Sequence, residues 1–506
     1  MSFIEFDDVY YTYPGGEKFA LEGITLSVTE GEFLAVMGEN GAGKTTFCKL
    51  INGIVPHLYG GRLSGTVTVD GCNTCAYSVP ELAFKAGMVL DDPDAQLFAS
   101  TVRHEAAFGP ENMRLPPPEI EERIKFALGA VGLTGFEDRK PSALSGGEKQ
   151  RLSIAASLSM KSGILVLDEP LSRLDPQGAA QVMSVLNDIK VKYGITIVIA
   201  SHNSELIAEY ADRVCVLNNG RIAALDTAKN IFSNHKLLEI NGIRPILPRS
   251  FTEYPVLFQS RSSLKEPLSN YSGSLGADAS GTPVIDIKNF CYKYPNGTAV
   301  ENINLRIFEN DFIALMGDNG CGKTTLLKNI TGLLRPSSGD IFLRGTNTGG
   351  LSVGEISGEI GFVTQNPDTQ LFTDSVFNEA AFALKKKRKQ GRRLSKTEIK
   401  QRVEDALSAV GLRDSGAFPH ALSRSDRTKT IIACVLAMGT RIILFDEVDV
   451  GNDYKGSLEI MNIAKDLHSK GYTIIFVTHN ISLACEYAQR LVKMDKNGIV
   501  FDGRRG

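Results

Sequence analysis

The sequence contains no apolar run long enough to cross a membrane. Its longest mainly apolar stretches, such as 195–200 and 474–477, have the length of a β-strand, whereas a spanning helix needs about 20 residues. The first residues are acidic and include no apolar segment, so we expect no secretory signal. The sequence therefore predicts neither a membrane span nor a secretory leader.

A surplus of charge of either sign is also missing. The 506 residues carry a formal net charge of -3, and no broad positive excess points to nucleic acid as a partner. The eight cysteines are spread along the chain, which is typical of reduced thiols in a cytosolic compartment. Cys72 and Cys75 form a single CxxC pair. Because zinc takes four ligands, we expect a loop there rather than a metal site.

What the chain does contain is an internal duplication. The segment GENGAGKTT at 38–46 recurs as GDNGCGKTT at 317–325, and three further motifs recur in the same order at almost the same spacing. These are Asp168-Glu169 with Asp446-Glu447, His202 with His479, and Tyr13 with Tyr294. Four motifs at nearly one spacing indicate two copies of one domain. We expect the copies at 1–245 and 284–506, joined at 246–283 by a flexible linker rich in Ser, Pro and Gly.

Each glycine-rich loop is predicted to hold phosphate. A short apolar strand precedes it, at 33–37 and 312–316, and the motif GxxxxGK[ST] requires a strand before it and a helix after it. The loop N–H groups cradle phosphate oxygens, the lysine reaches the β and γ oxygens, and the first threonine hydroxyl binds Mg²⁺. The predicted nucleotide ligands are Gly38, Asn40, Gly41, Gly43, Lys44, Thr45 and Thr46, with Gly317, Asn319, Gly320, Gly322, Lys323, Thr324 and Thr325.

One difference between the two loops is a thiol. Cys321 stands where the first copy has Ala42. We expect the neighbouring phosphate-facing N–H groups and Lys323 to favour its thiolate.

The run 144–176 carries further phosphate chemistry. Its first five residues, LSGGE, open a helix with a hydroxyl and two glycines, so that backbone N–H groups can approach an anion. The apolar run 164–167 predicts a buried parallel strand. It ends in Asp168-Glu169, where one carboxylate suits Mg²⁺ and the other can orient or deprotonate water. This sequence of signature, strand, acidic pair and turn resembles the ATP-binding cassette (ABC) family, and the resemblance covers both copies.

The resemblance implies an α/β fold of two tandem P-loop ABC nucleotide-binding domains. Each would have a parallel-sheet core, an antiparallel β subdomain and a helical signature subdomain. It also implies ATP hydrolysis with ATP and Mg²⁺ as cofactors. Tyr13 and Tyr294 would stack on adenine, unless they merely belong to a strand edge. The implied metal ligands are Thr45, Asp168, Thr324, Gln365 and Asp446, and the implied catalytic residues are Glu447, His479, Gln365, Glu169 and His202.

In ABC proteins each ATP lies between the P-loop of one domain and the signature of the other. The resemblance therefore implies that the Lys323 site is completed by Ser145, Gly146 and Gly147 and has every expected group. The signature that faces Lys44 instead reads Leu422-Ser-Arg-Ser-Asp426.

Departures from the family pattern gather on the Lys44 site. Arg424 and Ser425 replace the signature glycines, and the D-loop segment VGND at 450–453 replaces SRLD at 172–175. Asp91 stands where the second copy has Gln365. We expect the Lys44 site to bind MgATP and hydrolyse it poorly. The alternative is that Arg424 acts as a charge clamp and both sites turn over.

A second duplicated motif, DPDAQLF at 92–98 and NPDTQLF at 366–372, has the composition of a helix start. It also resembles the ATPase subunits of energy-coupling factor (ECF) transporters, which import vitamins and trace metal ions in bacteria and archaea. That resemblance implies docking of a transmembrane (T) subunit through its arginines, beside a separate substrate-binding (S) subunit. Asp92, Asp94 and Asp368 are the implied acceptors. Simple helix capping is the alternative.

An ECF role implies a peripheral protein on the cytoplasmic face of the cell membrane. The basic block KKKRKQGRR at 385–393 is expected to be a solvated loop or to contact anionic headgroups at the membrane surface, each basic residue contributing about 1 kcal/mol. The rival interpretation is a soluble twin-cassette ABC protein acting on ribosomes or nucleic acid. Such proteins carry a long charged helical linker, whereas 246–283 has only Arg249, Arg261 and Lys265 as basic residues. A regulatory ATPase without a transport role is a further alternative.

Overall fold

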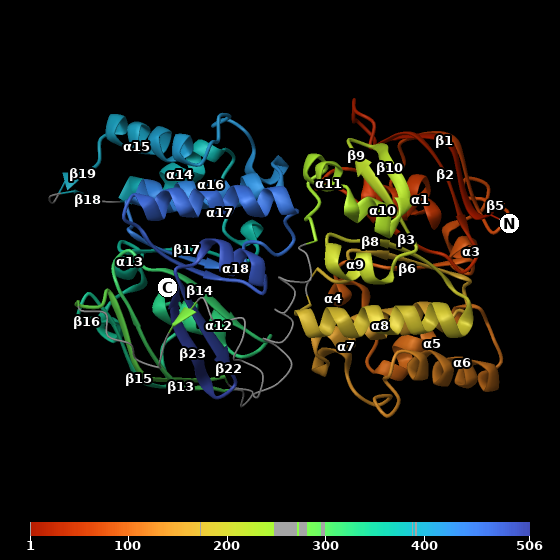
Figure 1. Cartoon of the computed structure of the whole chain (residues 1–506), viewed down its shortest axis with the longest axis horizontal. Helices are drawn as coiled ribbons and strands as arrows, with labels where there is room; N and C mark the ends of the chain where they lie inside the picture. Colours follow the sequence, from red (N-terminus) through yellow and green to blue (C-terminus); the bar gives the residue numbers. More distant parts are fainter. Residues whose placement is uncertain are drawn as a thin grey trace. The chain divides into compact units, whose positions relative to one another are not determined.

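The computed structural model describes residues 2–172, 174–246, 271–272, 281–294, 299–386, 388–389 and 392–505. Among these residues, no helix has both the length and the apolarity that a membrane crossing requires. The chain divides into two compact units, Met1–Leu247 with Asp453–Lys455 in one and Pro248–Asn452 with Gly456–Gly506 in the other (Figure 1).

The first unit is built on a six-stranded sheet with the order β10-β9-β3-β8-β7-β6. All neighbours pair in parallel except β10, which runs antiparallel to β9 at one edge. Every residue of β3, β7 and β8 is buried, because helices and a second sheet cover both faces, and this is why their sequences are continuous apolar runs. The strands are β3 (Phe33–Met37), β6 (Ala86–Val89), β7 (Ile164–Asp168), β8 (Thr196–Ala200), β9 (Arg213–Asn218) and β10 (Arg221–Thr227).

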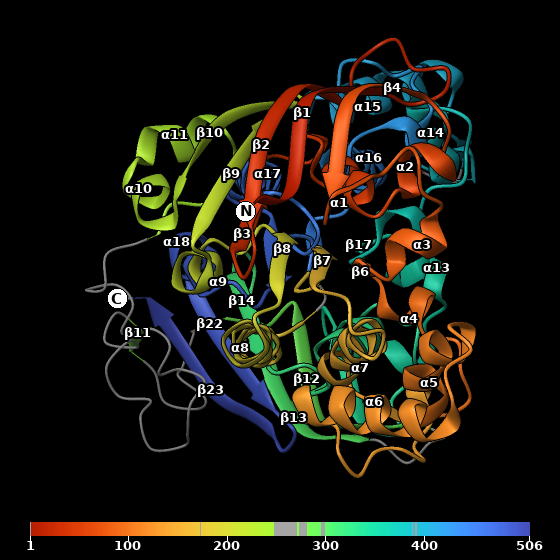
Figure 2. The same ribbon diagram turned by 90° about the vertical axis from the view of Figure 1, so that its right-hand side faces the viewer.

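An antiparallel sheet, β2-β1-β4-β5, lies over the P-loop helix α1 (Lys44–Ile51). Figure 2 shows α1 between this sheet and the parallel one. Phe47 of α1 stacks on Phe6 of β1 with ring centroids 4.4 Å apart, and the same core includes Leu34 and Val166 of the parallel sheet. The strands are β1 (Ser2–Thr12), β2 (Leu21–Thr29), β4 (Arg62–Val69) and β5 (Cys72–Asn73).

Helices fill the other face of the parallel sheet. Ala106, Leu128 and Leu152, from three different helices, share one core with Leu165 of β7. The signature helix α7 begins at Gly146 because Ser145 and Glu148 form a capping box, each side chain accepting from the other's backbone N–H. The helices of this unit, besides α1, are α2 (Ile54–His57), α3 (Val79–Ala83), α4 (Pro93–Gln96), α5 (Val102–Asn112), α6 (Pro117–Ala130), η1 (Pro141–Ala143), α7 (Gly146–Leu158), α8 (Pro176–Tyr193), α9 (Ser204–Tyr210), α10 (Ala228–Ser233) and α11 (His235–Ile240).

The second unit repeats this plan. Its main sheet has the order β11-β23-β22-β14-β21-β20-β17, and its antiparallel sheet has the order β13-β12-β15-β16. The strands are β11 (Tyr271–Ser272), β12 (Ile285–Lys293), β13 (Ala299–Ile307), β14 (Phe312–Gly317), β15 (Ser338–Leu343), β16 (Thr346–Asn347), β17 (Ile360–Val363), β20 (Ile442–Asp446), β21 (Thr473–Val477), β22 (Arg490–Asp495) and β23 (Gly498–Arg505). The helices are α12 (Lys323–Ile330), η4 (Thr348–Gly350), α13 (Val353–Ile356), η5 (Pro367–Thr369), α14 (Val376–Phe382), η6 (Ala383–Lys386), α15 (Lys396–Ala409), η7 (Pro419–Ala421), α16 (Arg424–Met438), α17 (Tyr454–Ser469) and α18 (Ile481–Tyr487).

These elements confirm the predicted fold class: each unit has a parallel-sheet core, an antiparallel sheet and a helical part that carries the signature. The basic block contains a short hairpin, β18 (Arg388–Lys389) with β19 (Arg392–Arg393), where we expected a loop. Most of the predicted linker, 247–270 and 273–280, lies outside the described residues. The limits of the domains and of the linker stay predictions.

Candidate functional site

The glycine-rich loop between β3 and α1 is shaped for a ligand that meets backbone. Gly38 has φ +147°, and a Cβ there would lie 2.2 Å from the carbonyl oxygen of Leu217, so only glycine fits. Gly41, at φ +82°, has no atom within 4 Å of where its Cβ would be. The loop therefore presents an open backbone surface at the start of a helix, the arrangement that binds phosphate.

The loop lysines are buried inside their own loops. Lys44 Nζ donates to the carbonyl oxygens of Gly38 and Glu39 at 3.0 and 3.1 Å. Lys323 repeats this with Gly317 and Asp318, at 2.8 and 3.0 Å. Burial lowers the pKa of Lys44, although the negative charge of Glu169 opposes the shift. An ammonium group held in this way lies where a phosphate would compensate its lost hydration.

The donor set beside each loop suits Mg²⁺. Thr45 Oγ1 donates to Asp168 Oδ1 at 3.1 Å, and Thr324 Oγ1 donates to Asp446 Oδ1 at 3.0 Å. Burial raises the pKa of both aspartates to about 6. The negative charge of each carboxylate is therefore poorly compensated by its surroundings, and a bound cation would stabilise it. Hydroxyl and carboxylate oxygens are the ligands that Mg²⁺ prefers, so these residues fit the metal that the sequence predicted.

The two glutamates that follow share an unusual backbone. Glu169 and Glu447 have φ +49° and +47°, a left-handed conformation that costs about 1–3 kcal/mol in a residue with a side chain. Strain of this kind gathers at functional sites. Its presence in both copies marks the positions that the sequence assigned to water activation.

In the second unit, Glu447 is held at both oxygens. Gln365 Nε2 donates to Oε2 at 2.9 Å, and His479 Nε2 lies 3.0 Å from Oε1. Burial tends to raise the pKa of Glu447, but the hydrogen bond and charge of His479, with the charge of Lys323, hold it below its usual value. The carboxylate is therefore ionised and oriented.

The first unit differs at the same place. His202 Nε2 lies 3.1 Å from Glu169 Oε1, but the Gln365 counterpart is Asp91. Burial, with the negative charge of Asp91 adding to it, raises the pKa of Glu169. Burial and the charge of Lys44 lower the pKa of His202 to about 3, so this imidazole is neutral. The pKa of the glutamate is therefore raised in the first unit and lowered in the second.

The signature starts also differ between units. In the first unit Ser145 caps α7 in the capping box with Glu148, and Gly146 and Gly147 add no side chain to the start of the helix. In the second unit Ser423 Oγ accepts from the N–H of Asp426, and Arg424 Nη2 donates to the carbonyl oxygen of Gln365 at 3.0 Å. The pairing of each signature with the other copy's loop stays a prediction.

Each predicted adenine-stacking tyrosine touches the P-loop helix through its hydroxyl. Tyr13 Oη lies 3.1 Å from Thr46 Oγ1, and Tyr294 Oη lies 2.8 Å from Thr325 Oγ1. The tyrosine rings are placed beside the phosphate cradle, and the adenine contact stays a prediction. The remaining predicted ligands, Asn40 and Asn319, lie in the loops themselves, and His202 Nε2 is 3.0 Å from Asn40 Oδ1.

The structure corrects the expectation for Cys321. Its side chain is buried, and burial raises the pKa of the thiol despite the positive charge of Lys323. The thiol packs into the core that contains Leu315 and Leu326 rather than facing the phosphate cradle. The thiolate is therefore disfavoured at neutral pH.

Two sets of residues were missed by sequence reasoning. Thr478 Oγ1 donates to the half-buried carboxylate of Asp449 at 2.7 Å and links the residue after β21 to the segment after Glu447. Buried Glu105 accepts from the N–H groups of Phe98 and Ala99, and Glu379 repeats this with the N–H groups of residues 372 and 373. The only sequence signal for the glutamates was their recurrence at the same place in both copies.

The DPDAQLF and NPDTQLF segments are helix starts, as their composition predicted. Asp92 Oδ1 accepts from the N–H of Asp94, and Asn366 Oδ1 accepts from the N–H of Asp368. The second acids are already paired within their own units. Asp94 lies 2.6 Å from Lys149 Nζ, and Asp368 lies 2.7 Å from Arg427 Nη1.

Beside each acid lies an exposed aromatic pair. Phe98 and Phe108 are 66% and 47% exposed and meet edge to face at 4.7 Å. Phe372 and Phe382 are 62% and 48% exposed and meet at the same distance. The exposed aromatic pair therefore recurs at the same place in both copies.

Comparison with known proteins gives one consistent result. A family profile described as ABC transporter matches residues 21–172 and 300–449. A provisionally named ABC transporter ATP-binding protein of Caldanaerobacter subterraneus subsp. tengcongensis is 36% identical, with 96% of this chain and 89% of the relative covered. One from Methanosarcina mazei, similarly named, is 35% identical, with 99% and 89% covered. Among solved structures, cbiO1 of Clostridium perfringens, described as part of the ABC transporter complex cbiONQ, matches at 33% identity and TM-score 0.44 over 50% of this chain and 99% of that one.

Proposed function

The chain belongs to the ABC transporter family, and from that premise we propose that it is the energy-coupling ATPase subunit of an ECF-type importer for a vitamin or trace metal ion. Family membership makes it an ATPase that uses ATP with Mg²⁺. Our proposal adds the membrane T and S subunits, the location at the cytoplasmic face of the membrane, and unequal contributions from the two copies.

Catalysis in this proposal is positioning and electrostatics. Thr324 and Asp446 would hold Mg²⁺, which would supply positive charge to the phosphates. Lys323 would bind the phosphates. Glu447 orients and activates water, because its ionised carboxylate is fixed by Gln365 and His479.

The first copy offers a weaker version of the same site. Asp91 cannot donate to Glu169 as Gln365 donates to Glu447, and burial, with a smaller contribution from the charge of Asp91, raises the pKa of the Glu169 carboxyl. We therefore propose that Lys44, Thr45 and Asp168 bind MgATP while most turnover occurs at Lys323. Loss of one preorganised donor costs about 10²–10³ in rate.

The proposal of a transport role rests on a surface that occurs in both copies, which we call the docking surface. Each surface consists of one acid and one aromatic pair: Asp94 with Phe98 and Phe108, and Asp368 with Phe372 and Phe382. Buried Glu105 and Glu379 accept from the backbone N–H groups of Phe98 and Phe372 and so fix one aromatic residue of each pair. An apolar platform beside a carboxylate suits a partner helix that ends in arginine, which would displace Lys149 or Arg427 from the acid.

Co-purification tests this proposal. The tagged full chain, extracted from membranes in mild detergent, should carry a stoichiometric hydrophobic subunit. Phe98→Ser with Phe372→Ser should remove that subunit, whereas Phe84→Ser, a control at another exposed phenylalanine, should retain it. Recovery of ribosomes or nucleic acid in place of a membrane protein would favour the soluble twin-cassette alternative. An unaltered membrane complex from the double variant would contradict the docking surface.

A further inference from the structure

We propose that Arg424 is a positioning residue for the Lys323 site and acts through Gln365 on Glu447. The proposal rests on the role assigned above to Glu447. In the sequence, Arg424 replaces a signature glycine, and we expected it to impair the Lys44 site. Within the second unit, however, its side chain contacts Gln365, which belongs to the Lys323 site.

The contacts form a continuous chain. Arg424 Nη2–H donates to the main-chain oxygen of Gln365 at 3.0 Å, across 59 positions of sequence. The side-chain amide of Gln365 then donates to Glu447 Oε2 at 2.9 Å. A guanidinium donor forms a stronger hydrogen bond than a neutral one. It therefore fixes the backbone of an otherwise exposed residue whose side chain orients the glutamate.

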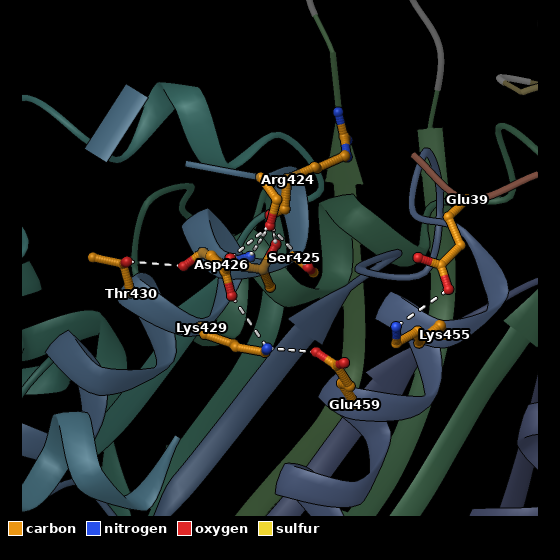
Figure 3. A network of polar contacts seen from close by, with 10 residues as sticks. Glu39, Arg424, Ser425, Asp426, Lys429, Thr430, Lys455 and Glu459 are labelled. Atoms are coloured by element: carbon orange, nitrogen blue, oxygen red, sulfur yellow. Dashed lines mark hydrogen bonds and ion pairs between the residues drawn. The ribbon is translucent and has the colours of Figure 1, made fainter. Parts of the chain in front are cut away.

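The direction of the Arg424 side chain supports this reading. Figure 3 shows it extending away from the chain of contacts that joins Asp426, Lys429 and Glu459. Asp426 is paired with Lys429 on the same helix, and the guanidinium of Arg424 contacts the Q-loop residue Gln365.

Gly451 makes room for the guanidinium. A Cβ on Gly451 would lie 3.0 Å from both Nε and Cζ of Arg424, so any larger residue would push the side chain aside. The first copy has the reverse assignment, with Gly146 in the signature and Arg173 in the D-loop. Arginine and glycine have thus exchanged places between the two loops.

The first unit has no counterpart of this chain among its described residues. Gly146 has no side chain to donate, and Asp91 offers a carboxylate where Gln365 offers an amide N–H. Arg424 and Gln365 therefore occur in the same copy, and both are needed for the arrangement that ends on Glu447.

The experiment measures turnover in a Glu169→Gln background, where the remaining steady-state phosphate release by the purified full chain comes from the Lys323 site. Arg424→Ala should lower kcat about tenfold, the effect of one charge-assisted hydrogen bond on a catalytic group. The KM for ATP should stay within about twofold, because Lys323 and Thr324 keep their contacts. Arg424→Lys should restore most of kcat, since an ammonium group can donate to the same carbonyl.

A second pair of variants leaves Arg424 in place. Gly451→Ala should reproduce the loss of kcat by displacing the guanidinium. Gly471→Ala is the matched control, because Gly471 also has a left-handed backbone, at φ +84°, but nothing lies within 4 Å of its Cβ position. Backbone strain alone would impair both variants equally, and displacement of Arg424 would impair only the first.

The outcomes separate this inference from the proposed function. If Glu447→Gln retains activity, the role of Glu447 itself is wrong. If Glu447→Gln is inactive while Arg424→Ala stays within about twofold of its background, only the role of Arg424 is overturned. Failure of Arg424→Lys to exceed Arg424→Ala overturns it too. If Arg424→Ala unfolds, the comparison of Gly451→Ala with Gly471→Ala decides instead, and equal kcat in that pair overturns the inference.

Discussion

Exchanging each glutamate to which we assign water activation, Glu447 and Glu169, for glutamine tests the proposed inequality of the two copies most directly. Glu447→Gln keeps the shape of the side chain and removes the negative charge that activates water. It also replaces one acceptor oxygen by an N–H group, so that either Gln365 or His479 loses its partner, at present 2.9 and 3.0 Å away. Glu169→Gln makes the same change where the pKa of the carboxyl is already raised by burial and by Asp91.

The expected magnitudes follow from these contacts. A positioned general base contributes about 10²–10⁴ in rate, so Glu447→Gln should reduce phosphate release by at least about a hundredfold. If the first site is already impaired by about 10²–10³, it supplies on the order of 1% of turnover or less, and Glu169→Gln should leave the steady-state rate nearly unchanged.

The assay is phosphate release by the complex with its membrane subunits, at saturating MgATP. Binding of a fluorescent ATP analogue and the thermal unfolding midpoint serve as controls for each variant. Because the binding groups Lys323 and Thr324 are untouched, Glu447→Gln should retain nucleotide and accumulate an ATP-loaded state. A larger loss from Glu169→Gln than from Glu447→Gln would refute the reasoning, and equal losses would leave it without support.

Three further predictions concern other parts of the chain. Asp94→Lys with Asp368→Lys should break the pairs with Lys149 and Arg427 and weaken assembly with the membrane subunit, measured by co-purification, while ATP binding by the isolated chain persists; normal complex yield would contradict the docking surface. Cys321, with its pKa raised by burial, should react with maleimide at neutral pH more slowly than exposed Cys75, measured by mass spectrometry of labelled peptides, and faster labelling at Cys321 would show that the cradle opens to it. Thr478→Val should lower stability by about 1–3 kcal/mol because it strands the carboxylate of Asp449, and Asp449→Leu in addition should recover most of the loss in calorimetry; a double variant as unstable as the single one would show that the pair is not the cause.

Much of the fold and of the phosphate chemistry could be predicted from the sequence because both depend on short segments. A buried parallel strand must be an apolar run, and a phosphate cradle must have glycines before a lysine, so β3, β14 and both P-loops were visible without a structure. Because each motif occurs in both copies, the assignment of one copy supported that of the other.

Contacts between distant segments could not be predicted. Cys321 is adjacent to Lys323 in sequence, which suggested a reactive thiol, but its surroundings are set by Leu315 and Leu326 in the core. Asp94 and Asp368 were correctly placed at helix starts, yet their pairing with Lys149 and Arg427 depends on how the signature helix packs against those starts. A sequence motif gives the chemical type of a side chain but not the residues that it contacts in the fold.

The departures of the second copy from the family pattern change meaning once these contacts are known. By sequence, Arg424, Gly451 and the difference between Asp91 and Gln365 counted as three independent losses that the family arrangement assigns to the Lys44 site. In the second unit Arg424 contacts the backbone of Gln365 and lies against Gly451, so two of the three departures, Arg424 and Gly451, are physically coupled. These two count once as a sign of decay at the Lys44 site, and Asp91, which lies in the first unit, counts separately. The same coupling supplies a positive reason for the change, because it orients Glu447 through Gln365. The unequal contributions that we propose for the two copies therefore have two sources: the support that Arg424 gives to the Lys323 site, and the replacement of glutamine by Asp91 at the Lys44 site.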